Sequence, residues 1–143
     1  TLNSGASMAM VEVGVHACTD VTGFGLLGHL HEMTAGAKVG ARVFLSKVPV
    51  ISEAWGLVQS GICPGGTKRN RESLRGALLW NPGISEEAQL ILCDAQTSGG
   101  LLIAVPKEMT ATLIQRLQAH RAPAAALIGE VIEDPDGRIW VEP

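Results

Sequence analysis

Residues 16–33 (HACTDVTGFGLLGHLHEM) constrain the fold most, because they join three local patterns without a break. Residues 16–21 read as a β-strand, and residues 22–25 form a turn because two glycines fall within four positions. Leucine and methionine then recur at helical intervals from Leu26 to Met33. The segment therefore predicts a strand, a glycine-rich turn and a helix in immediate succession.

This succession can hold an anion beside a cation. The first amides of a helix have no partner within the helix, and glycines let a phosphate approach them. Alternation along the strand places Asp20 at its carboxyl end, where a carboxylate can hold the Mg²⁺ that accompanies phosphate. Asp20 could equally bond its own backbone in a turn or cap the helix. The glycine spacing matches neither the Walker P-loop nor the dinucleotide fingerprint, so the residues alone leave both readings open.

Length and composition narrow the class of protein. The 143 residues predict one domain with a substantial core. A net charge of −3 argues against a nucleic-acid partner. The chain has neither an apolar run long enough for a membrane span nor a signal-peptide pattern, so we expect a cytoplasmic protein without a membrane partner. Its three cysteines are widely spaced, which indicates neither a disulfide framework nor a zinc site.

The remaining chain predicts helices that alternate with strands. The apolar run at 101–105 is expected to be a strand buried on both faces. The turn residues at 134–137 predict a hairpin between the last two strands. Together these features indicate a mixed sheet covered by helices, in the α/β or α+β class. Helices are expected at 1–14, 52–60, 68–79, 85–93 and 107–120, and strands at 41–45, 101–105, 125–133 and 138–142. Gly14 is expected to end the first helix, and Ser52 and Ser85 are expected to cap the helices that they begin.

Three stretches resemble the signature of the selenophosphate synthetases (selenide, water dikinases). They are residues 19–29 (TDVTGFGLLGH), 64–70 (PGGTKRN) and 96–102 (QTSGGLL), in the order found in that family. The motifs belong to the C-terminal half of a two-domain enzyme, so the resemblance implies that residues 1–143 form this half. It also implies an α+β fold of three α/β/α layers, a mixed sheet flanked by helices as in the C-terminal domain of the aminoimidazole ribonucleotide synthetase superfamily.

The resemblance also implies a function. The family makes selenophosphate from selenide, ATP and water, releases AMP and phosphate, and requires Mg²⁺. By this resemblance Asp20 is a Mg²⁺ ligand at the ATP phosphates, and Thr22, Gly23 and Gly25 shape the phosphate-binding turn. The catalytic cysteine or selenocysteine and its lysine belong to the N-terminal domain. We therefore expect no catalytic residue here, an inactive isolated chain, and partnership with the N-terminal domain in a homodimer.

The second motif forms a candidate substrate loop. The backbone amides of Gly65 and Gly66, the hydroxyl of Thr67 and the guanidinium of Arg69 could receive a phosphate or selenium anion. Arginine suits this role because its donors form a directional fork. Asn70 completes the family motif and is a candidate with them.

Other polar residues favour structural roles. Arg71 and Arg75 are expected on a solvated helix face. His29 is expected either at the surface or bonded within the structure. In the third region the family usually has Asp-Pro-Gln, whereas this chain has Asp94-Ala95-Gln96. Without the proline, this loop should be less rigid.

Three alternatives stay open. The chain could come from another enzyme of the superfamily, such as a ribotide synthetase or thiamine-phosphate kinase, although Phe24, His29 and the loop at 64–70 favour the selenium enzyme. It could instead be a non-catalytic domain for folding and dimerisation, or a stand-alone module that binds a small molecule.

Overall fold

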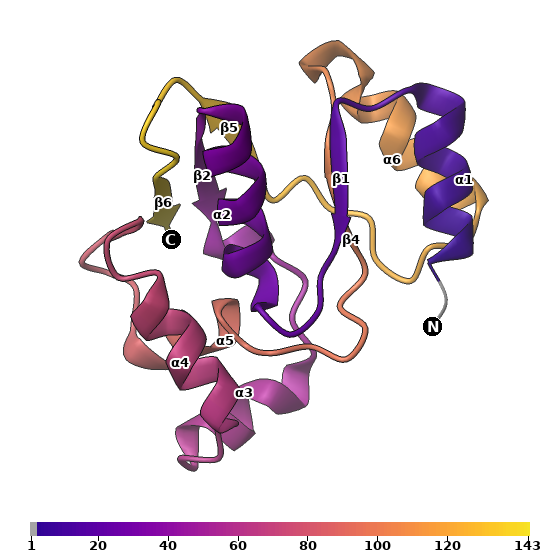
Figure 1. Ribbon diagram of the computed structural model, residues 1–143. Coiled ribbons are helices and arrows are strands. Elements are labelled where there is room, and N and C mark those ends of the chain that lie inside the picture. Colours follow the sequence, from indigo (N-terminus) through magenta and orange to yellow (C-terminus); the bar gives the residue numbers. More distant parts are fainter. Residues whose placement is uncertain (1–2) are drawn as a thin grey trace.

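A computed structural model describes residues 3–143, in which helices cover two separate sheets (Figure 1). The helices are α1 (Ser4–Val13), α2 (Gly25–Ala37), α3 (Ser52–Gln59), α4 (Gly65–Ser73), α5 (Glu86–Leu92) and α6 (Thr110–Ala119). Short 3-10 turns occupy Leu45–Lys47 and Lys107–Met109. The strands are β1 (Ala17–Asp20), β2 (Gly40–Phe44), β3 (Leu78–Trp80), β4 (Leu101–Ala104), β5 (Gly129–Ile132) and β6 (Ile139–Glu142).

The larger sheet is mixed, with the strand order β3-β6-β2-β5. Strand β6 runs parallel to both β2 and β3, and β5 runs antiparallel to β2. The smaller sheet pairs β1 with β4 in antiparallel register, so that Asp20 lies opposite Leu101. The predicted fold class, a mixed sheet flanked by helices, is confirmed, and the two-stranded sheet is an addition to it.

The hairpin predicted between the last two strands is wrong. Strands β5 and β6 do not pair, because β2 lies between them. Ile139 and Val141 are both 0% exposed, so β6 gains more apolar burial inside the sheet than it would as the outer strand of a hairpin. Asp134 instead bonds the guanidinium of Arg138 across the connection.

The predicted start and end of the helix at 68–79 are also wrong, and so is the loop predicted before it. Helix α4 begins at Gly65, directly after Pro64, whose φ of −58° leads the chain into the first turn. The helix ends at Ser73, and Leu78 starts a strand opposite Ile139. Leu78 is buried in the core, which outweighs the weak helical pattern of this segment.

The other predicted helices and strands are present with small shifts, except that the strand predicted over 125–133 is confined to Gly129–Ile132. Helix α1 starts at Ser4, and its end at Gly14 agrees with the predicted stop, since that residue has a φ of 75°. Thr1 and Leu2, which were predicted to belong to this helix, lie outside the described residues. Ser85 caps α5 by accepting from the amide of Ala88, as expected. Ser52 does not cap α3 and bonds Glu53 instead.

Two apolar clusters lie on either side of the β1–β4 pair. The larger one joins α2, α5 and the mixed sheet, and the smaller one joins α1 and α6, as the arrangement in Figure 1 makes visible. Leu102 of β4 packs against the larger cluster, whereas Ile103 packs against the smaller one. Both faces of this strand therefore contact an apolar cluster, but the predicted burial is wrong, because all four residues of β4 stay partly exposed in a sheet of only two strands.

None of the helices within residues 3–143 combines the length and apolar character that a membrane span requires.

Candidate functional site

Asp20 ends β1 with an exposed carboxylate. Within residues 3–143 this carboxylate has no hydrogen-bond or ion-pair partner. Helix α2 has Phe24 at its N-cap, and no side chain bonds the amides there. Asp20 therefore neither caps the helix nor stabilises the turn, and its charge is available to a ligand.

Cys18 lies on the same strand, two residues before Asp20. Partial burial, and then the negative charge of Asp20, raise the pKa of the Cys18 thiol. The thiol is therefore protonated and weakly nucleophilic at neutral pH. Cys18, Cys63 and Cys93 are all free, as the cysteine spacing predicted.

The two turn glycines serve different purposes. Gly25 has a φ of 73°, and a Cβ on it would lie 2.7 Å from the backbone of Cys93 and Asp94. Only glycine fits this close approach between the turn and the end of α5. A Cβ on Gly23 would meet nothing within 4 Å. Gly23 is thus open to solvent, and the fold does not require a glycine there.

The amides of the turn are partly free. The amide of Gly25 donates to the carbonyl of Thr22 at 3.0 Å and closes the turn. The amides of Gly23 and Phe24 have no acceptor among residues 3–143. These two donors lie at the start of α2, where an anion can use them.

His29 bonds the turn from within α2. The residue is 7% exposed, and its Nε2 lies 3.1 Å from Thr22 Oγ1. Its Nδ1 lies 3.0 Å from Glu32 Oε2, one turn further along the helix. His29 is therefore bonded within the structure, which is one of its two predicted roles, and connects the hydroxyl of Thr22 to a carboxylate.

Phe24 fixes the position of this histidine. The two rings lie 5.5 Å apart between centroids, tilted by 52°. A Cβ on Gly28 would lie 2.7 Å from the Cβ of Phe24, so glycine makes room for the phenylalanine. Within the motif at 19–29, Asp20 is thus exposed to solvent. The turn beside it is held by contacts of Thr22, Phe24, Gly25 and His29.

Helix α4 is anchored against the turn by Asn70. The Nδ2 amide of Asn70 donates to the carbonyl of Gly23 at 2.9 Å and to that of Cys93 at 3.1 Å. The hydroxyl of Thr67, which is 1% exposed, donates to Asp94 Oδ1 at 2.5 Å. Asn70 therefore bonds α4 to the turn before α2, and Thr67 bonds it to the segment after α5. The roles of these two residues toward a ligand stay predictions.

The loop after α5 is held by the same residues. Thr67 Oγ1 also accepts from the amide of Ala95 at 3.2 Å, a bond that a proline at 95 could not make because proline has no N–H. Gln96 Nε2 donates to Asp94 Oδ2 at 3.0 Å. These bonds hold the loop at 94–96, where the family usually has a proline and this chain has Ala95.

The basic residues of the second motif divide into two groups. Arg71 pairs with Glu86 and Arg75 pairs with Glu72, which agrees with the expected helix-surface role. Arg69 has no ion-pair partner among residues 3–143. Its guanidinium folds back toward the start of α4, where a Cβ on Gly65 would lie 3.5 Å from Nη1. The Arg69 guanidinium therefore lies beside Gly65 and Gly66 at the start of α4.

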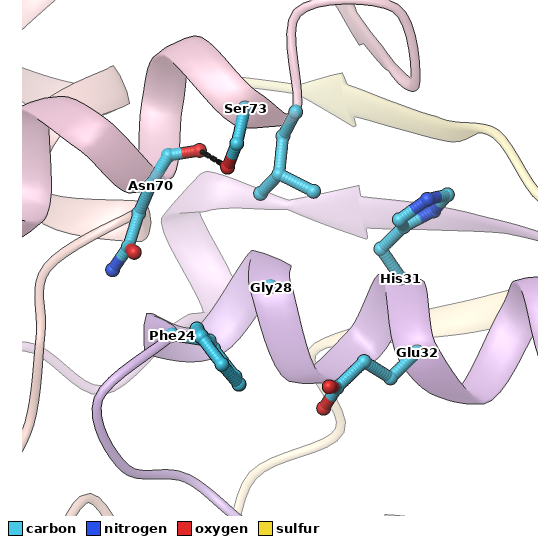
Figure 2. Close-up of a pocket in the computed structure, with 7 residues that line it drawn as sticks. Phe24, Gly28, His31, Glu32, Asn70 and Ser73 are labelled. Atoms are coloured by element: carbon cyan, nitrogen blue, oxygen red, sulfur yellow. Dashed lines mark hydrogen bonds between the residues drawn. The ribbon is translucent and has the colours of Figure 1, made fainter.

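A groove of about 160 Å³ runs between α2 and α4 (Figure 2). Phe24 and Glu32 extend from the same side of α2, and Gly28 lies between them. Asn70 extends from α4 toward the start of α2, and Leu74 is among the residues that line the groove. The carboxylate of Glu32 is reached from this groove, since its side chain is 58% exposed.

A complete metal site is not formed within residues 3–143, where no three His, Cys, Asp or Glu side chains cluster suitably for an ion. Asp20 is a hard oxygen ligand of the kind that Mg²⁺ prefers, and it is free. The residues present therefore fit one part of a magnesium site, whose further ligands would come from another domain.

Comparison with known proteins identifies the family. Residues 3–142 match the model described as AIR synthase related protein, C-terminal domain. The chain belongs to this family. The predicted resemblance is confirmed, since the relatives described next are named selenide, water dikinase.

The chain is similar to several such proteins over most of its length. The one from Carboxydothermus hydrogenoformans is 46% identical over 142 residues, which cover 99% of this chain and 40% of that protein. The one from Shewanella sp. (strain MR-4) is 48% identical over 121 residues, covering 84% of this chain and 33% of that protein. The chain thus spans about two fifths or less of the length of these relatives.

Three residues that organise the site were not predicted. Asp94 and Gln96 bond the second and third motifs, but adjacent polar residues in a loop give no signal of distant partners. Glu32 could have been found, because positions three apart face each other on a helix and it follows His29 at that spacing.

Proposed function

We propose that this chain is the C-terminal domain of an ATP-dependent selenophosphate synthetase, which converts selenide, ATP and water into selenophosphate, AMP and phosphate. One observation carries the proposal for the site: the carboxylate of Asp20 is exposed and without a partner within residues 3–143, beside the free amides of Gly23 and Phe24. A charge and two donors that are unpaired at one turn are available to a ligand, and this supports the proposal. The names of the relatives support the reaction.

In this proposal Asp20 holds Mg²⁺ together with carboxylates of the N-terminal domain. When bound, the ion would neutralise phosphate charge and orient the phosphate chain. Gly23 lets the phosphate approach the turn, because no side chain stands there. Gly25 contributes by closing the turn against α5, and Thr22 by bonding His29.

The start of α4 is proposed to receive a second anion, either a phosphate or the selenium species. Gly65 and Gly66 expose the first amides of the helix, and Arg69 folds over them. Thr67 and Asn70 hold this helix end beside the phosphate turn. The proposal therefore assigns Arg69 a direct contact, and Thr67 and Asn70 a supporting role.

The expected partners complete this account. An N-terminal ATP-binding domain, assembly as a homodimer and a cytoplasmic location are all part of the proposal. The greater length of the relatives supports a further domain.

A nucleotide titration tests this function against a purely structural role. The chain is joined to the N-terminal domain, and binding of a non-hydrolysable ATP analogue is measured with and without Mg²⁺ for wild type and Asp20→Asn. We expect the substitution to abolish most of the Mg²⁺-dependent gain in affinity, since it removes the charge and keeps the size. An unchanged gain would favour a non-catalytic folding or dimerisation domain.

A further inference from the structure

The contacts from Glu32 through His29, which is buried, to Thr22 define the directions of their hydrogen bonds. An ionised carboxylate can only accept, so the Nδ1 atom that lies 3.0 Å from Glu32 must carry a proton. In the neutral ring the opposite nitrogen, Nε2, then has no proton and can only accept. With the ring in this neutral form, the hydroxyl of Thr22, 3.1 Å away, donates its single proton to His29.

This direction has a consequence for the site. With its proton turned toward His29, the Thr22 oxygen can only accept from a ligand. A phosphate oxygen is also an acceptor and would gain no hydrogen bond from it. The amides of Gly23 and Phe24, by contrast, are donors without partners among residues 3–143.

We propose that Glu32 and His29 are positioning residues that keep the Thr22 oxygen an acceptor, so that it receives a cation-bound water while the amides of Gly23 and Phe24 receive the phosphate. The inference rests on the proposed function and divides the turn into a cation side, with Asp20 and Thr22, and an anion side. The histidine ring is held for this purpose. It is buried, bonded at both nitrogens and packed against Phe24.

Nitrogen NMR of the histidine side chains tests the first half of the inference in the 143-residue chain. At pH 8 we expect the shift of a protonated nitrogen for Nδ1 of His29 and that of an unprotonated nitrogen for Nε2. Glu32→Gln should move part of the ring population to the other tautomer, because a glutamine amide can donate to Nδ1 as well as accept from it. Glu72→Gln removes the same charge from another pair spaced three residues apart and should leave His29 unchanged.

Kinetics of the chain joined to its N-terminal domain test the second half. Glu32→Gln should raise the KM for ATP by about 10-fold, the size of effect expected when an outer-shell partner is lost, with a smaller change in kcat and an unchanged unfolding midpoint. Glu72→Gln should match wild type. A proton on Nε2 of wild-type His29 at pH 8, or a Glu32→Gln variant with unaltered nitrogen shifts or KM, would overturn the inference.

The same experiments separate this inference from the proposed function. If Asp20→Asn abolishes activity while Glu32→Gln changes neither the tautomer nor KM, the inference fails and the function stands. If Asp20→Asn leaves activity intact, the proposed role of Asp20 as a Mg²⁺ ligand fails and the assignment of a cation side fails with it, even where the tautomer is as expected.

Discussion

Replacing Gly25 with alanine should destabilise the chain, because the new Cβ would lie 2.7 Å from the backbone of Cys93 and Asp94. A positive φ, here 73°, costs an alanine about 1–2 kcal/mol. Forcing a methyl group against a packed backbone costs about 1–3 kcal/mol more. Alanine also restricts the unfolded chain, which returns about 0.4–1 kcal/mol. The middle values of these ranges give a net loss of about 3 kcal/mol in the free energy of unfolding.

Urea denaturation measures this loss. With a slope of about 2 kcal/mol per molar urea, the unfolding midpoint of Gly25→Ala should fall by about 1–2 M. Gly23→Ala is the matched control two residues away, since a Cβ there meets nothing within 4 Å. The free energy of unfolding of Gly23→Ala should differ from that of wild type by no more than about 0.5 kcal/mol. Equal losses for the two variants would refute the claim that only Gly25 is packed against the end of α5.

Three further predictions concern the surroundings of the site. Thr67→Val should lower the free energy of unfolding, measured in urea, by about 1–3 kcal/mol, because it leaves the polar partners of Thr67 unsatisfied. Thr67→Ser should recover most of this loss, and equal stabilities of the two variants would contradict the bonds described. The hydrogen bond from Arg138 lowers the pKa of Asp134 below its ordinary value of 3.8. Wild type should therefore be more stable than Asp134→Asn above pH 3.8, and this difference in the free energy of unfolding should vanish as the pH falls below that value. A difference that grows in acid would contradict the prediction. Burial raises the pKa of Cys93 to about 12, so iodoacetamide at pH 8 should label the half-buried Cys63 far faster, and equal rates would mean that Cys93 is not in the core.

The sequence predicts well where the signal is local. The strand, glycine turn and helix at 16–33 are present, and so are the stop at Gly14 and the cap at Ser85. Each of these depends on residues within one or two turns of each other. Their prediction therefore needs no knowledge of the distant chain.

The errors arise where distant packing decides. Nothing in residues 125–142 indicates that β2 will separate β5 from β6, because that order depends on burying Ile139 and Val141 beneath helices far away in the sequence. Leu78 likewise lies in a strand and not in a helix, because it pairs with the distant Ile139. Long-range pairings of this kind leave no trace in the local pattern.

The candidate site shows the same division. Asp20 could be selected because a carboxylate follows a strand and precedes a glycine turn, whereas the difference between Gly23 and Gly25 required the position of α5. The hydroxyl of Thr67 was predicted to face a ligand, and only the fold reveals its bonds to Asp94 and Ala95.

The most direct test of the account is selenide-dependent AMP formation by the chain joined to its N-terminal domain, with Mg²⁺, for wild type and Asp20→Asn. Asp136→Asn, an exposed carboxylate in the turn before β6, controls for loss of one negative charge. We predict that Asp20→Asn loses at least about 100-fold in activity while its unfolding midpoint and that of the control stay near wild type. Activity of Asp20→Asn within a few-fold of wild type would contradict the account, since Asp20 would then be only a residue at the end of a strand.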